Sequence, residues 1–121
     1  MSQLIEEKSQ FEAQIIIKGK GGHSSEPYKT RNSIIIGFEI INAINANVAY
    51  QFNSFDDFTL VPTAFDAGTK ENIIPEEARV QYKGIYANPE YAETLKNLIS
   101  ATAEKISGVY GATVEVFFEN I

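Results

Sequence analysis

The chain contains no cysteine and only one histidine among its 121 residues. Without cysteine it can form no disulfide, no thiolate zinc site and no cysteine nucleophile. The single histidine, His23, cannot supply the several His, Asp and Glu ligands that a two-metal centre requires. We therefore expect no metal site within this chain. The absence of cysteine is also consistent with a cytoplasmic location.

Long apolar runs and clustered positive charge are missing as well. No apolar run approaches the ~20 residues needed to cross a bilayer. The first ten residues carry Glu6, Glu7 and Lys8 where a signal peptide would be apolar. The formal net charge is −6, whereas a phosphate backbone attracts clustered lysine and arginine. We expect neither a membrane nor a nucleic acid as a partner.

Four segments of the sequence have the pattern of a β-strand. Residues 11–20 alternate, and one face of this strand carries Phe11, Ala13, Ile15 and Ile17. Further strands are predicted at 58–65, 78–86 and 113–119. The second of these four strands contains Pro62, which has no amide hydrogen to donate and therefore places that strand at a sheet edge.

Two segments have the period of a helix. The first spans residues 33–50, and Asn32 or Ser33 can cap its start. Its predicted core stripe is Ile34, Phe38, Ile41, Ile44 and Val48. The second begins at Pro89 with Asn88 as its cap, and Gly111 can close its C-terminus. Its predicted core face is Tyr91, Leu95, Leu98, Ile99, Thr102, Ile106 and Val109.

The element order βαββαβ predicts an α+β fold in one domain. With right-handed crossovers it forms a ferredoxin-like sandwich, in which two helices cover one face of a four-stranded antiparallel sheet ordered 4-1-3-2. We expect residues 11–121 to form this domain. Residues 1–10 are expected to be an N-terminal hinge or a cloning remnant.

The outer face of the first helix is only weakly polar. It carries small and apolar side chains with a single charge, namely Ile35, Glu39, Asn42, Ala43, Ala46 and Tyr50. Such a face is typical of a protein contact surface, unless Phe52 and Phe55 of the following loop cover it. Because this helix lies beside the edge strand in the predicted fold, we expect the two to form a homodimer interface.

Two loop segments carry patterns typical of one family. Residues 18–27 read KGKGGHSSEP directly after the first strand, and residues 67–75 read AGTKENIIP between the second and third strands. Together they resemble the lid domain of the zinc metallohydrolases that include aminoacylase, acetylornithine deacetylase, hippurate hydrolase and glutamate carboxypeptidase. Members typically show a G-x-G-G-H-[SA]-[SAG] turn and, further along, an N-[VI]-I-P turn. The resemblance covers residues 11–119.

The resemblance implies a dimerisation (lid) domain inserted into a catalytic domain, which would hold two zinc or similar divalent ions and a general-base glutamate. The parent would hydrolyse amide or peptide bonds of small N-acyl amino acids or peptides, and this segment alone would be inactive. Carried over by motif, His23 would stabilise the oxyanion in the partner subunit's active site, and Asn72 would bind substrate. A histidine N–H can favour the tetrahedral oxyanion over the ground state.

The sequence departs from the family pattern at the end of the third strand. Members often carry there an arginine that clamps the substrate carboxylate, and Tyr86 occupies the matching position. Tyrosine can donate one hydrogen bond but cannot form a bidentate charged clamp. We expect Tyr86 to be at most a minor substrate contact, which leaves the substrate class open.

The predicted topology bears on the two motif residues. The first two strands run in the same direction, so the end of the first strand and the loop after the second share one end of the sheet. His23 and Asn72 should therefore be neighbours. Both chain termini should lie at the opposite end, about a strand length away, an arrangement that suits insertion into another domain.

Two alternatives remain open from the residues alone. A freestanding ferredoxin-like regulatory or structural dimer module would have the same fold without a catalytic role, His23 being an exposed imidazole and Asn72 a turn residue. An RNA-recognition domain shares the element order, and residues 83–87 resemble part of its third-strand motif. Against that alternative, Ile15, Ile16 and Ile17 stand where a stacking aromatic is needed.

Overall fold

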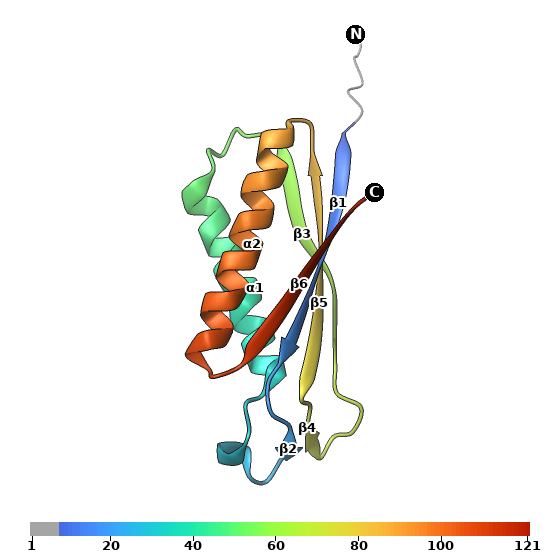
Figure 1. The fold of residues 1–121 in the computed structure, drawn as a ribbon, viewed down its shortest axis with the longest axis vertical. Helices are drawn as coiled ribbons and strands as arrows, with labels where there is room; N and C mark the ends of the chain where they lie inside the picture. Colours follow the sequence, from blue (N-terminus) through green and yellow to red (C-terminus); the bar gives the residue numbers. More distant parts are fainter. Residues whose placement is uncertain (1–7) are drawn as a thin grey trace.

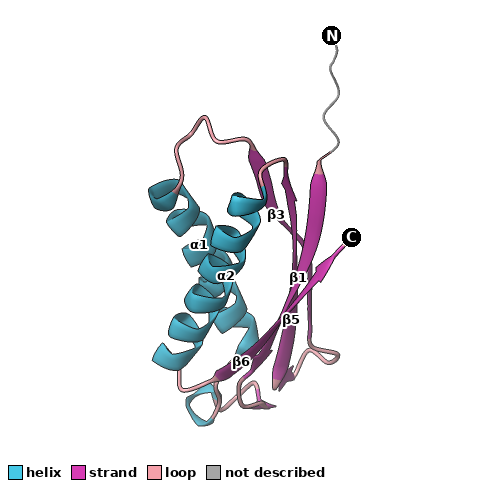
Figure 2. Cartoon of the chain, turned by 45° about the horizontal axis from the view of Figure 1, so that its top comes forward, coloured by secondary structure: helices cyan, strands magenta, loops and turns pink. Residues whose placement is uncertain are grey.

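The computed structural model describes residues 8–121 (Figures 1 and 2). Its main sheet has four long antiparallel strands, β1 (Ser9–Lys18), β3 (Phe58–Ala67), β5 (Glu77–Tyr86) and β6 (Thr113–Asn120), in the order β3-β5-β1-β6. The helices α1 (Ser33–Gln51) and α2 (Pro89–Val109) cover one face of this sheet (Figure 2). The expected α+β class is confirmed. The expected segment 1–10 lies mostly outside the described residues, and Ser9 and Gln10 belong to β1.

Three short elements were not expected from the sequence: β2 (Gly22–His23), the 3-10 helix η1 (Pro27–Lys29) and β4 (Ile73–Ile74). Strands β2 and β4 form a separate two-stranded ribbon. The extra strands change the numbering, so the sheet does not read 4-1-3-2 in these labels. Numbering only the long strands along the chain gives 2-3-1-4, which is the expected order 4-1-3-2 read from the opposite edge, and the architecture is broadly consistent with a ferredoxin-like sandwich.

The helix boundaries follow from their caps. The side chain of Asn32 accepts a hydrogen bond from the Ile34 amide at 3.0 Å, and that of Asn88 accepts one from the Glu90 amide at 3.0 Å. These bonds satisfy amides that have no partner within the helix. Gly111, just beyond α2, has φ +70°, the left-handed conformation that closes many helices. The predicted caps and the C-terminal glycine are confirmed.

The core lies between the helices and the sheet. Alternation along β1 is confirmed, since Phe11, Ala13, Ile15 and Ile17 are all fully buried. Helix α2 contributes buried residues including Leu95 and Ile99. In the middle of β5, the hydroxyl of the fully buried Tyr82 has no hydrogen-bond partner among the described residues. Burial raises the pKa of Tyr82 to about 12.

The core stripe predicted for α1 is confirmed only in part, because Ile44 is buried and Ile41 and Val48 pack against the core, but the buried face is rotated around the helix away from Phe38. The buried residues are Ser33, Ile36, Gly37, Ile40 and Ile44. Phe38, assigned to the core from its spacing, is instead 61% exposed. The cause is a close approach of the sheet, because a Cβ on Gly37 would lie 2.7 Å from the ring of Phe65 on β3. The smallest side chain therefore faces the sheet, and Phe38 turns outward.

Helix α1 is long and apolar enough, by length and composition alone, to cross a membrane, although Glu39 and several asparagines interrupt any continuous apolar run. Its buried residues pack on the sheet of this domain. Only 28% of its most apolar window is buried in the chain, so much of this apolar helix faces outward. The feature of α1 that needs an explanation is therefore its apolar outward surface and not its length.

Strand β3 forms one edge of the sheet, as Pro62 predicted. Its pairing with β5 shifts register between Pro62 and Ala64. This bulge bends the edge beside α1, where the rings of Phe38 and Phe65 lie 5.9 Å apart. The bend brings the edge strand and the outward-facing part of α1 into one surface.

The two ends of the domain are different. Strand β1 begins beside Tyr86, and β6 ends beside Phe11, so the start of β1 and the end of β6 lie at one end of the sheet. The β2–β4 ribbon lies at the other end, at the bottom of Figure 1. Ten residues of β1 at about 3.3 Å each separate the two ends by roughly 30 Å.

Candidate functional site

The β2–β4 ribbon brings the two predicted site residues together. His23 pairs with Ile73 in the ribbon, and the amide of Ser24 donates to the carbonyl of Asn72 at 3.0 Å. The expectation that His23 and Asn72 are neighbours is confirmed. The ribbon itself was not anticipated, although the β-branched pair Ile73–Ile74 opposite a glycine-rich turn was a usable signal.

Glycines allow the ribbon to approach the rest of the domain closely. A Cβ on Gly21 would lie 2.7 Å from the carbonyl oxygen of Ile74, and one on Gly19 would collide with the carbonyl oxygen of Arg31. Lys20 and Arg31 exchange two backbone hydrogen bonds of 2.9 Å each. The turn after β1 is therefore held against both β4 and the segment that leads into α1.

Further contacts fix the loop that carries Asn72. The hydroxyl of the fully buried Ser33 donates to the carbonyl of Pro75 at 3.0 Å. The amide of Gly19 donates to the carbonyl of Glu76 at 2.8 Å. Ile74 is buried, with 9% of its surface exposed. The sequence offered Ser33 only as a candidate helix cap, and its bond to Pro75 was not predicted because the two residues are 42 positions apart.

The His23 side chain is exposed, but one of its ring nitrogens is already bound. Nδ1 lies 3.1 Å from the amide nitrogen and 2.8 Å from the hydroxyl oxygen of Ser25. No hydrogen bond to Nε2 is formed within residues 8–121. The exposed Asn72 side chain likewise has no hydrogen-bond partner in that range. Both groups are therefore open to a ligand.

Tyr86 does not join this site. It lies at the opposite end of β5, paired with Ser9, and is 9% exposed. Its ring belongs to the core and lies 6.2 Å from the ring of Phe11. The expected substrate contact by Tyr86 is not supported, because the alternation of β5 turns this side chain towards the helices.

An aromatic cluster closes the same end of the core. The ring of Phe52 lies 4.6 Å from Phe58 and 6.0 Å from Tyr91. The Tyr91 hydroxyl donates to Asp56 at 3.0 Å, and this hydrogen bond raises the pKa of Tyr91. Phe52 therefore packs within this aromatic cluster, while Phe55 is 93% exposed. The loop therefore does not lay Phe55 over α1.

The residues expected in the dimer interface lie on the surface of α1. Ile35, Glu39, Asn42, Ala46 and Tyr50 are exposed, and Ala43 is half-buried. A different part of the helix borders the edge strand, where α1 and β3 enclose an apolar groove of about 560 Å³. The groove is lined by Ile34, Phe38, Ile41, Pro62, Thr63, Ala64, Phe65 and Ala67. Sequence reasoning missed this set because it assigned Phe38 to the core.

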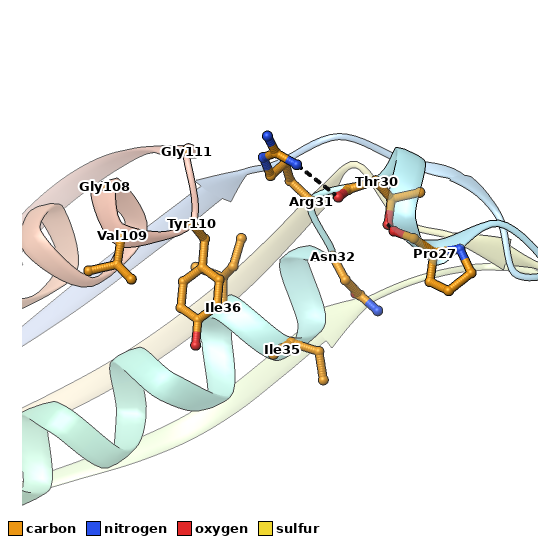
Figure 3. A pocket seen from close by; sticks show the side chains of 10 residues that line it. All are labelled: Pro27, Thr30, Arg31, Asn32, Ile35, Ile36, Gly108, Val109, Tyr110 and Gly111. Atoms are coloured by element: carbon orange, nitrogen blue, oxygen red, sulfur yellow. Dashed lines mark hydrogen bonds between the residues drawn. The ribbon is translucent and has the colours of Figure 1, made fainter.

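A larger hollow, of about 690 Å³, lies between the start of α1 and the end of α2 (Figure 3). Pro27, Arg31, Ile35, Val109 and Tyr110 are among the residues around it. In Figure 3 the Arg31 guanidinium donates a hydrogen bond to the Thr30 carbonyl, at 3.4 Å. Neither His23 nor Asn72 lines this hollow, so it is separate from the candidate site.

The described residues do not fit a metal centre. Within residues 8–121 no three His, Cys, Asp or Glu side chains gather closely enough to hold an ion together. His23 could contribute only one nitrogen, and the donor set of a two-metal site needs several carboxylates and imidazoles. What the site offers is hydrogen-bond donors on a fixed ribbon.

Comparison with known proteins gives a consistent picture. Residues 5–111 match the family described as "Peptidase dimerisation domain". Thermostable carboxypeptidases 1 and 2 of Saccharolobus solfataricus are 38% and 36% identical over 104 residues, which cover 86% of this chain and 26% of each relative. N-acetylcysteine deacetylase of Bacillus subtilis is 29% identical over 102 residues, covering 84% of this chain and 27% of that protein. The chain spans about a quarter of the length of these relatives.

Solved structures share the fold. A tripeptidase from Staphylococcus aureus superimposes with a TM-score of 0.80 at 22% identity, covering 93% of this chain and 29% of that one. A dinuclear metal-binding peptidase of the M20 family from Bacillus subtilis gives 0.69 at 22% identity, covering 92% and 25%. In each case the matched region is a part of a longer chain.

Proposed function

Because this chain belongs to the peptidase dimerisation domain family of the M20 peptidases, we propose that it joins two subunits of a longer metal-dependent amide or peptide hydrolase and places His23 in the partner's active site. One observation carries this proposal. His23 presents an Nε2 with no hydrogen bond in residues 8–121, on a ribbon held to the end of β1 and to the start of α1, roughly 30 Å from the end where β1 begins and β6 ends. A group placed there is far from the catalytic part of its own chain.

The proposed role of His23 is to donate a hydrogen bond to the oxyanion. Hydrolysis of an amide passes through a tetrahedral intermediate whose oxygen carries negative charge. A donor already held in position stabilises that charge without reorganising. Because the interaction is stronger with the charged intermediate than with the neutral carbonyl, it accelerates the chemical step.

Asn72 is proposed to bind the substrate beside His23. Its amide can donate to a carboxylate or a carbonyl without adding charge. The hydrogen bond from Ser24 to the Asn72 carbonyl ties the two residues to one rigid unit. A substrate held by Asn72 would therefore lie within reach of the imidazole.

The metal ions of the proposed enzyme, zinc or similar divalent ions, would be bound by residues outside this segment. The same holds for the general base. The curated relatives are named for cleaving peptides or removing acyl groups from amino acids, and we propose a substrate of this class, a small peptide or N-acyl amino acid. The tyrosine in place of the family arginine leaves the recognition of a free carboxylate to other residues.

The dimer is proposed to form through α1 and the free edge of β3. Phe38 and Phe65 give this surface an apolar centre in the groove beside β3, and the exposed Ile35, Asn42 and Ala46 lie at its margin on the same helix. Pairing two copies about a twofold axis would bury the exposed apolar part of α1 and cover the unpaired strand edge.

The test is complementation in the full-length protein. His23→Ala should lower kcat by a factor on the order of 10² to 10³, the usual loss for an oxyanion donor, with metal content unchanged. Mixing this variant with one that lacks the general base should restore partial activity, because a heterodimer would contain one intact composite site. Ser24→Ala, on the same turn, serves as the control and should retain activity.

Subunit exchange must be shown independently by mass spectrometry. If exchange occurs and two inactive variants never complement, His23 does not act on the partner's site.

A further inference from the structure

We propose that Ser25 is a positioning residue that holds the His23 imidazole in its Nε2–H tautomer, so that the donor faces away from the turn. The proposal begins from the two short contacts to Nδ1. The Ser25 amide nitrogen lies at 3.1 Å and its hydroxyl oxygen at 2.8 Å. A neutral imidazole has one nitrogen with a hydrogen and one that accepts.

The backbone amide decides between the two tautomers. An N–H group can only donate, so the Ser25 amide requires Nδ1 to be the accepting nitrogen. If Nδ1 carried the hydrogen, two N–H groups would face each other. The Ser25 hydroxyl, which could donate or accept, must then donate to Nδ1 as well. The hydrogen of the neutral ring is left on Nε2.

The turn leaves the Ser25 amide little freedom to point elsewhere. The amide before it, on Ser24, donates to the Asn72 carbonyl at 3.0 Å, and the amide after it, on Glu26, donates to the His23 carbonyl at 3.0 Å. Three consecutive amides are thus committed, and the middle one is directed at the imidazole. Because the two nitrogens lie on opposite flanks of the ring, Nε2–H faces away from the turn, towards solvent.

This inference rests on the proposed function only for the reason why the Nε2–H tautomer is useful. An oxyanion needs a hydrogen-bond donor, and the Nδ1–H tautomer would present a lone pair at Nε2 instead. Holding the ring in the Nε2–H tautomer removes the unproductive Nδ1–H form from the population. The tautomer itself is a property of this chain and can be measured without any activity.

Nitrogen-15 NMR of the histidine ring provides the measurement, and the chain suits it because His23 is its only histidine. Protonated and unprotonated ring nitrogens have well-separated shifts, assigned through their couplings to the ring protons. At about pH 9, well above the ordinary titration range of imidazole, the folded chain is compared with the same chain in urea. Each hydrogen bond to Nδ1 should lower the Nδ1–H fraction about fivefold relative to the unfolded chain.

Substitutions separate the hydroxyl from the turn. Ser25→Ala keeps the amide and loses the hydroxyl, so the Nδ1–H fraction should rise about fivefold from its folded value and remain below that of the unfolded chain. Ser25→Thr should restore the wild-type ratio, and Ser24→Ala should leave it unchanged. A folded chain with the same tautomer ratio as the unfolded chain overturns the proposal, as does an equal effect of Ser24→Ala and Ser25→Ala.

In the full-length protein, Ser25→Ala should lower kcat with KM unchanged, and Ser25→Thr should recover it. If the tautomer shifts as expected while kcat does not change, the proposed catalytic role of His23 fails, and the positioning by Ser25 stands.

Discussion

At the residue scale, the direction of the His23 imidazole is set by the turn that follows it, where Nδ1 contacts Ser25. His23 and Asn72 were identified from motifs, and the strand directions predicted that they would be neighbours. The contact of Nδ1 with Ser25 could not be predicted, because it depends on the path of a turn whose residues are mostly glycine and serine. Tyr86 was placed by aligning a motif, which says which strand a residue is on and not which face it occupies.

One prediction at this scale concerns Tyr82. Its buried hydroxyl has no partner among the described residues, and a buried polar group without a hydrogen bond costs free energy. Tyr82→Phe removes only that oxygen and should raise the free energy of unfolding by about 1 kcal/mol near neutral pH. Urea titration followed by circular dichroism measures this. Tyr50→Phe, at a position 89% exposed, is the control and should change little.

The same residue predicts a pH dependence. The pKa of Tyr82 is about 12 in the folded chain against the ordinary value of 10.0. Between these values the unfolded chain releases a proton that the folded chain retains, so the stability of the fold is complete below pH 10 and falls as pH rises towards 12. At the top of this window, Tyr82→Phe should avoid roughly 2–3 kcal/mol of that loss. A variant less stable than wild type would instead mean that the hydroxyl has a partner, such as a buried water molecule.

At the element scale, helix boundaries were predicted more accurately than helix rotation. Asn32, Asn88 and Gly111 mark the ends of α1 and α2 as expected. The one-sided pattern of α2 also fixed its buried face, apart from Val109, which is 77% exposed. Helix α1 is apolar on most sides, so the spacing of its apolar residues could not indicate which side faces the sheet. A spacing of small residues, with Ser33 and Gly37 four apart, was the signal that the sheet approaches closely there.

The corrected phase of α1 predicts which face joins two copies. Phe38 and Ile35 are 61% and 50% exposed, but only Phe38 lines the groove beside β3. Phe38→Glu would place a charge at the centre of the proposed interface and should weaken dimerisation roughly 30-fold or more. Ile35→Glu, a matched change on the same helix, should leave the dimer largely intact.

Sedimentation velocity at micromolar concentration measures the dimer, and circular dichroism verifies that both variants are folded. If Ile35→Glu weakens the dimer more than Phe38→Glu does, the interface lies on the face predicted from the sequence. A wild-type chain that stays monomeric at high micromolar concentration contradicts the interface altogether.

At the scale of the whole molecule, the fold was predictable because each level of the sequence indicates the same arrangement. Alternation, caps and the edge proline all specify two helices over one sheet. The β2–β4 ribbon escaped prediction because two-residue strands leave no periodic signal. The cause of its stability is long-range contact, such as the bond from Ser33 to Pro75.

The composition of the whole chain leads to a further prediction. With no metal-binding cluster in residues 8–121, the isolated chain should retain no stoichiometric zinc after dialysis and should not hydrolyse N-acyl amino acids. Elemental analysis and a coupled amine-release assay measure the two properties. Turnover abolished by a chelator would reveal a site that the described residues do not contain, and the full-length protein provides the positive control.

Because the ribbon lies at the far end of a long sheet, a small rotation of the whole domain moves the ribbon through a large distance. Its tip, with His23, lies roughly 30 Å from the end where β1 begins and β6 ends. A rotation of about 10° at that end would carry the imidazole through about 5 Å, whereas a hydrogen bond tolerates only a few tenths of an ångström around its length of about 3 Å. The strength of any contact made by Nε2 is therefore governed by the tilt of the entire domain, and a small angular change far from the histidine is enough to engage or release it.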